Sequence, residues 1–231
     1  MKHARLATFI VTATIGLSLL AATAASASAP EFNPGTPQAF TGDGSTSQLE
    51  TSAGTKIECL KSLSKGEITG AKTVGNLVVV FHNCSSTEDG GCSLKSEGGP
   101  NASLIITKTL DGELGSVKKT EAVSGVGLLI LPSPGTSFVT LEGTCLPVSP
   151  APVTGSVAGE VTPVNGVAST DGKLIFQGNG AAGEQLIRSI NVLGTIVKPG
   201  FKALGLQETN VIGVGLTLTT NACDCDMRGT T

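Results

Sequence analysis

Hydrophobic residues along this chain are grouped in short runs that end at glycine, proline or asparagine. The strongest run is Leu77–Phe81, which Gly75-Asn76 precede and Asn83 follows. It is too short for a helix and mostly β-branched or aromatic, so it predicts a strand that is covered on both faces or central in a sheet. Weaker runs predict further strands at Lys56–Leu60, Gly66–Gly70, Leu104–Ile106, Glu113–Val117, Val126–Leu131, Gly135–Leu141, Val153–Val161, Leu174–Phe176 and Val211–Thr219.

The connections between these runs are short, which predicts antiparallel neighbours, because parallel strands need a crossover of about a dozen residues or more. Asp111-Gly112 and Asp171-Gly172 are turn signals, the first of them typical of a hairpin. Glu184–Val192 is the best helix candidate, since Leu186 and Ile190 are four residues apart. Ile187–Val192 would serve equally well as a strand.

Composition favours strands over helices. The chain has 31 glycines, 11 prolines and only 14% charged residues, whereas long amphipathic helices need Leu, Glu, Lys and Arg at helical spacing. A hydrophobic content of 39% still allows a folded core. We therefore predict an all-β fold with a single antiparallel β-barrel or β-sandwich domain, stapled by disulfides.

The first residues have the pattern of a signal peptide. Lys2, His3 and Arg5 precede an apolar region, and a stretch of small residues follows it. We expect cleavage after Ala27 and a secreted, extracellular protein. A retained membrane anchor is the alternative, but the apolar region is short for a span, and no later segment is long enough to cross a membrane. We predict a flexible leader at 28–44, with a possible edge strand at Ala39–Thr41, and the β-domain at 45–231.

Six cysteines in an exported chain indicate disulfides. The loop of small and acidic residues after Cys84 can bend back easily, which favours a Cys84–Cys92 bridge, and Cys59–Cys145 is the second predicted bridge. Cys223 and Cys225 are then left to staple the tail. Thiol exchange by this pair, or metal binding with Asp224 and Asp226, is a weaker alternative, because no histidine or second cysteine pair accompanies it.

Candidates for catalysis are few. His82 is the only histidine after the signal peptide, and no nucleophile motif accompanies it, so a surface position at a strand end is the simpler interpretation. Paired carboxylates could act in a glycosidase, which places two of them across a cleft. The candidate pairs are Glu88 with Asp89, Asp111 with Glu113, and Glu50 with Glu58. We assign no catalytic, cofactor-binding or metal-binding residue, and a net charge of −3 without a basic run argues against nucleic acid.

Part of the chain resembles a known group of proteins. The residues that carry the likeness are Leu49-Glu50-Thr51, Gly54-Thr55, Ile57, Cys59, Gly66-Glu67-Ile68-Thr69-Gly70, Thr73-Val74-Gly75-Asn76, Phe81, Cys84, Gly112-Glu113-Leu114-Gly115, Val126-Gly127-Leu128-Leu129, Gly155-Ser156-Val157 and Thr162-Pro163-Val164-Asn165. They resemble a family of uncharacterised secreted proteins from high-GC Gram-positive bacteria, over about Phe40 to Gln177. The resemblance implies one compact extracellular domain and supplies no activity. Cys223 and Cys225 lie outside it.

From the sequence we expect a secreted, non-catalytic protein of the cell envelope or medium, which acts by surface binding or as a structural component. Its partner would be an unknown envelope or extracellular molecule. An extracellular hydrolase with paired carboxylates is one alternative and requires a cleft lined by acidic residues. A small-ligand-binding β-barrel is the other, and a solid, side-chain-filled interior would exclude it.

Overall fold

The structure, a computed structural model, describes residues 30–33, 37–51, 56–86, 91–119, 123–146, 149–162, 164, 171–178, 185–203, 206–212, 214–220 and 226–228. Within these ranges, side chains are described for all except 33, 50, 51, 123, 124, 171 and those from 200 onward. The described part consists of strands and connecting turns, with no helix. The signal peptide predicted at 1–27 lies outside it.

The strands are numbered in chain order. They are β1 Glu31–Asn33, β2 Gln38–Gly44, β3 Ser47–Thr51, β4 Lys56–Ile68, β5 Thr73–Ser86, β6 Lys95–Ser96, β7 Leu104–Ile106, β8 Leu110–Lys118, β9 Val123–Pro132, β10 Ser137–Glu142, β11 Ala151–Thr162, β12 Asp171–Phe176, β13 Ser189–Val192, β14 Thr195–Val197, β15 Gly200–Ala203, β16 Leu206–Ile212, β17 Val214–Thr220 and β18 Asp226–Arg228.

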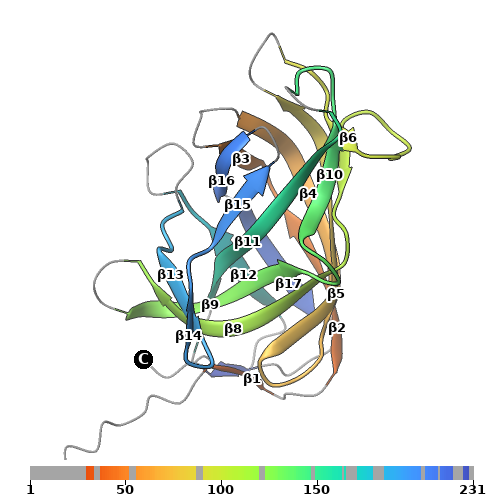
Figure 1. The fold of residues 1–231 in the computed structure, drawn as a ribbon. Helices are drawn as coiled ribbons and strands as arrows, with labels where there is room; N and C mark the ends of the chain where they lie inside the picture. Colours follow the sequence, from red (N-terminus) through yellow and green to blue (C-terminus); the bar gives the residue numbers. More distant parts are fainter. Residues whose placement is uncertain are drawn as a thin grey trace, which may run out of the picture.

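The longest pair of strands, β4 and β5, forms one wall of the molecule (Figure 1). A tight turn joins them, in which the Thr69 amide donates a hydrogen bond of 2.9 Å to the Thr73 carbonyl. The predicted strand Leu77–Phe81 lies within β5, which has β4 on one side and β7 and β8 on the other. The central position expected from its apolar run is therefore confirmed.

The strands curl around a common interior (Figure 1). Antiparallel pairings run from β2 through β4, β5, β8, β9, β11, β12 and β17 and return to β2. The sheet as a whole is not closed, because β13 and β14 branch from β8 and leave an edge at β14. The prediction of an all-β, antiparallel, disulfide-stapled domain is confirmed.

The described buried hydrophobic residues form two clusters in the interior. The larger one, here called the main core, includes Phe40, Leu77, Leu110, Leu141 and Phe176 and extends over most of the described strands. The smaller one, here called the hairpin core, lies beneath the β13–β14 hairpin and consists of Val117, Leu129, Ala158, Ile187, Ile190 and Val192. Five of these residues lie on β8, β9, β11 and β13, which pair with one another in the sheet, and Ile187 lies just before β13.

Several local predictions are wrong. Glu184–Val192 does not form a helix over its described part, since Ser189–Val192 is strand β13. Asp111-Gly112 is not a turn, because both residues lie inside β8 and pair with β9. The strand expected at Val211–Thr219 is divided between β16 and β17. Tertiary pairing has overridden the local turn and helix signals at these positions.

The strand expected at Ala39–Thr41 is confirmed as part of β2, but it is not an edge. It pairs with β4 on one side and β17 on the other. Residues 38–44 therefore belong to the sheet, although the sequence pattern assigned them to a leader. The predicted strands Lys56–Leu60 and Gly66–Gly70 are not separate: the first and residues 66–68 of the second are the two ends of β4, which ends at Ile68.

The predicted disulfide pairing is also wrong. The bridges are Cys59–Cys84 and Cys92–Cys145, with Cα–Cα separations of 4.1 and 6.0 Å. Cys59 and Cys84 face each other directly across the β4–β5 pair, so the strand register brings their side chains together. Cys223 and Cys225 lie outside the described residues.

Candidate functional site

An apolar cavity of about 130 Å³ lies in the main core. Its wall comes from strands far apart in the sequence, from β3 to β12, and includes Phe81, Phe138 and Phe176. The other lining residues are Ser47, Gln48, Leu49, Ile57, Cys59, Ser62, Leu77, Val79, Ile105, Thr107, Leu110, Ile130, Val139, Leu141, Val153, Val157 and Leu174. No carboxylate, lysine, arginine or histidine is among these lining residues, all of which belong to the described part of the chain.

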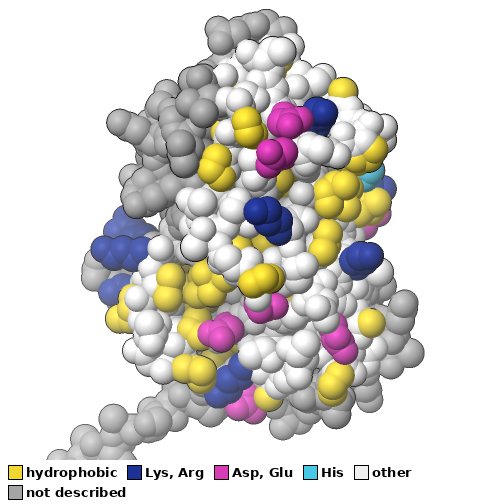
Figure 2. All heavy atoms as spheres, turned by 45° about the vertical axis from the view of Figure 1, so that its right-hand side comes forward, with side chains coloured by type: hydrophobic (Ala, Val, Ile, Leu, Met, Phe, Trp, Pro, Cys, Tyr) yellow, Lys and Arg dark blue, Asp and Glu magenta, His cyan; other side chains and the backbone are white. Residues whose placement is uncertain are grey.

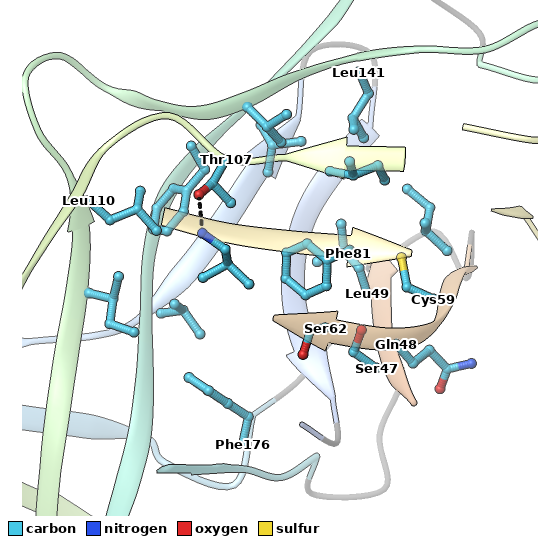
Figure 3. A pocket seen from close by; sticks show the side chains of 18 of the residues that line it. Ser47, Gln48, Leu49, Cys59, Ser62, Phe81, Thr107, Leu110, Leu141 and Phe176 are labelled. Carbon is cyan, nitrogen blue, oxygen red and sulfur yellow. Dashed lines mark hydrogen bonds between the residues drawn. The ribbon is translucent and has the colours of Figure 1, made fainter. Parts of the chain in front are cut away.

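Strand alternation explains how the sequence builds this wall. Leu77, Val79 and Phe81 are two residues apart on β5, so their side chains share the face that turns inward. Ser62 of β4 lies directly opposite Phe81 and shares that face. Figure 3 shows both side chains at the cavity, together with Phe176 from the far side.

Two hydroxyl groups in the wall have different surroundings. The Thr107 hydroxyl oxygen accepts a 2.9 Å hydrogen bond from the Val79 amide, drawn in Figure 3. Ser62 has no exposed surface, and its Oγ has no hydrogen-bond partner. A buried hydroxyl without a partner costs about 1–3 kcal/mol of folding free energy. Ser62 is therefore destabilising compared with an alanine at the same position.

The polarity of β4 is inverted around this serine. Ser62 and Ser64 face inward and both have unpartnered Oγ atoms, whereas Leu60 and Leu63 face outward and are 56% and 39% exposed. Leu63 lies opposite Val80, which lies opposite Ile106, so the outer surface here is apolar. Figure 2 shows apolar side chains gathered beside a histidine on this face.

The residues considered as catalytic candidates do not meet at the cavity. His82 lies on the outer side of β5, opposite Lys61 and Leu104, with its Nε2 buried and unpartnered. Asp111 and Glu113 are two residues apart on β8, outside the cavity wall. Glu58 lies opposite Gln48, and Glu50 lies opposite Lys56. Glu88 and Asp89 lie outside the described residues.

The described side chains contain no group of three or more His, Cys, Asp or Glu residues that could hold a metal ion. Sequence reasoning missed the cavity residues. The nearest signal was the serine-for-leucine inversion in Leu60–Ser64, which breaks the alternation expected of a half-buried strand.

Comparison with known proteins adds no further constraint. No protein-family model matches the chain, and no curated protein or solved structure matches it. In the described ranges, no helix has the length and apolar character that a membrane crossing requires. The two disulfides are compatible with an extracellular protein.

Proposed function

We propose that this chain is an exported, non-catalytic carrier that holds a small apolar molecule inside its curled sheet, at the cell envelope or in the medium. The observation that carries the proposal is the cavity, which is apolar, lies in the main core and is not filled by the described side chains. A ring of about eight strands is just wide enough either to be packed solid or to hold one small ligand. Here the space is left open.

The cavity volume limits the size of the ligand. An engineered apolar cavity of about 150 Å³ stays dry and binds benzene or xenon, whereas sites for drug-sized ligands measure about 300–1,000 Å³. A volume of about 130 Å³ therefore suits one aromatic ring or a short alkyl group. Larger amphiphiles would have to leave most of their atoms outside.

Ser62 indicates what else the ligand carries. Its unpartnered hydroxyl could donate a hydrogen bond to a ligand oxygen placed beside it, and the rest of the wall would favour hydrocarbon. The proposal is therefore specific for a small ring or chain with one polar group, of which phenol is a convenient representative.

Export is part of the proposal, and three observations support it. The first residues have the pattern of a signal peptide, the chain resembles a secreted family, and four cysteines form disulfides. Mass spectrometry of the protein recovered from the culture medium tests this part directly, because cleavage after Ala27 fixes the N-terminal residue.

Thermal unfolding with and without benzene or phenol tests the carrier function. A ligand at about ten times its Kd stabilises the folded state by about 1.4 kcal/mol, which raises Tm by about 3 °C in a domain of this size. Xenon NMR provides a second measurement, because the chemical shift of xenon changes inside an apolar cavity.

The matched control is Ser62→Leu, which places a leucine side chain in the void. This variant should lose both the benzene shift and the xenon signal while it stays folded. The proposal fails if neither benzene, phenol nor xenon binds the wild-type protein, or if Ser62→Leu binds them equally well.

A further inference from the structure

The β13–β14 hairpin projects two large apolar side chains into solvent. Leu193 and Ile196 are each 69% exposed, the highest values among the exposed large hydrophobic residues of the described part. The hairpin forms an edge of the sheet (Figure 1). Single exposed apolar residues are common on protein surfaces, so exposure alone does not identify a binding site.

The backbone at the tip supplies a second observation. Leu193 and Gly194 form the two-residue loop between Val192 and Thr195, with φ values of 50° and 87°. Two positive φ values define a type I′ turn, in which Asn-Gly is strongly preferred. Leucine is disfavoured in this left-handed conformation, so the chain holds an apolar residue where asparagine would be more stable.

The hairpin holds this tip in place. Ile190 and Val192 are buried in the hairpin core, and β13 pairs with β8. Asn191 lies opposite Ile196 on the outer face, so Ile196 and Leu193 project away from the core. Leu193 and Ile196 therefore project from a hairpin that β13 attaches to the sheet.

Two cations flank the hairpin. Arg188 precedes β13 and Lys198 follows β14, and both are exposed. Residues 185–203 contain no aspartate or glutamate, although the whole chain has a net charge of −3. This local excess of cations is complementary to an anionic surface.

From the exposed Leu193 and Ile196, the left-handed turn and the flanking cations, we infer that the hairpin docks on an anionic lipid bilayer. Leu193 and Ile196 enter the boundary between headgroups and acyl chains, and Arg188 and Lys198 stay at the headgroups. Amphipathic surface elements with an apolar tip and a basic flank bind membranes in this way. This docking site is separate from the cavity and does not depend on the carrier function.

Vesicle co-sedimentation tests the inference without any cavity ligand. The exported protein, with its N-terminus verified by mass spectrometry, is mixed with vesicles of equal parts phosphatidylglycerol and phosphatidylcholine, or with phosphatidylcholine vesicles alone. We expect saturable binding to the anionic vesicles, with an affinity that falls as salt is raised. Binding to neither kind of vesicle would overturn the inference.

Leu193→Asn is the decisive variant, because it creates the Asn-Gly pair that the turn prefers. Its Tm should be unchanged or higher, while vesicle binding should weaken about tenfold through loss of the leucine side chain. Ile196→Thr removes apolar surface but keeps a β-branched residue, and it should weaken binding similarly. Equal binding by Leu193→Asn and wild type would contradict membrane docking.

The electrostatic part has its own variant. Arg188→Gln with Lys198→Gln should weaken binding to anionic vesicles about thirtyfold. Leu60→Gln is the matched control, because it removes an exposed leucine from the outer face of β4. It should bind as wild type does, and a loss of binding in Leu60→Gln that exceeds the loss in Leu193→Asn would place the docking surface elsewhere and refute the inference.

Discussion

Leu49, Val79 and Phe81 belong to the wall of the main core but are only partly buried, whereas Val117, Ala158 and Ile190 in the hairpin core have no exposed surface. The hairpin core is dense because glycines allow close backbone approach. A Cβ atom added at Gly115 would clash with the Asn191 carbonyl, and one added at Gly127 would clash with Val117. Glycine also allows close approach in the main core, where a Cβ atom added at Gly159 would clash with Leu174, but this region contains the cavity.

The two regions also differ in their cross-links. Both disulfides belong to the void-containing region, where Cys59 lines the cavity and Cys92 and Cys145 pack against the main core. The hairpin core contains no cysteine. Among the described residues, the disulfides therefore cross-link the region that contains the cavity.

Removing the disulfides should cause the largest loss in the free energy of unfolding. Cys92→Ala with Cys145→Ala opens a link of sequence separation 53, and Cys59→Ala with Cys84→Ala opens one of 25. Chain entropy predicts losses of about 4 and 3.5 kcal/mol, respectively. Urea unfolding of the oxidised proteins measures both losses. A loss below about 1 kcal/mol in both variants would mean that the bridges do not compensate for the void.

Gly115→Ala should have the next largest effect, because its Cβ meets backbone that cannot move without shifting β13. We expect a loss of about 3 kcal/mol, measured by urea unfolding. Gly125→Ala on β9 is the control, since the nearest atom to its added Cβ is the carboxylate end of Glu160, which can move. If the two variants are equally stable, the hairpin core is not densely packed.

Ser62→Leu should act in the opposite direction. It removes an unpartnered buried hydroxyl and fills part of the cavity, so we expect a gain of about 1.5 kcal/mol in the same assay. A loss of more than about 1 kcal/mol would show that the interior cannot accept the added volume.

The smallest effect concerns ligand choice. Ser62→Ala keeps the cavity but removes its unpartnered hydroxyl, so phenol should bind about fivefold more weakly than to wild type while benzene binding is unchanged. Titration calorimetry with the two ligands measures the difference. An equal loss for both ligands would assign Ser62 a role in packing alone.

Much of the fold could be predicted from the sequence. The apolar runs around Leu77–Phe81, Val126–Leu131 and Val153–Val161 are strands because branched side chains fit a buried sheet. Disulfide pairing could not be predicted, since it depends on the register that sets Cys59 opposite Cys84. β4 was divided into two predicted strands because Leu60–Ser64 has its leucines outside and its serines inside.

The candidate site was less accessible to prediction. A cavity is defined by atoms that are missing between strands far apart in the sequence, and no local pattern encodes that space. The turn at Leu193 could not be predicted either, because the sequence signal for such a turn is Asn-Gly, and here leucine stands in place of asparagine. In both places the chain departs from the locally preferred residue, which is typical of functional positions.

The pairing of β2 with β17 sets the order in which the molecule can be completed. Gly44 and Leu216 are partners although they lie near opposite ends of the chain. The β2–β17 pair cannot form until β17 has been synthesised, and contacts between residues so far apart in the sequence form slowly. Under the proposed export, an architecture that closes only through such distant pairings keeps the chain from completing its ring before it has crossed the membrane.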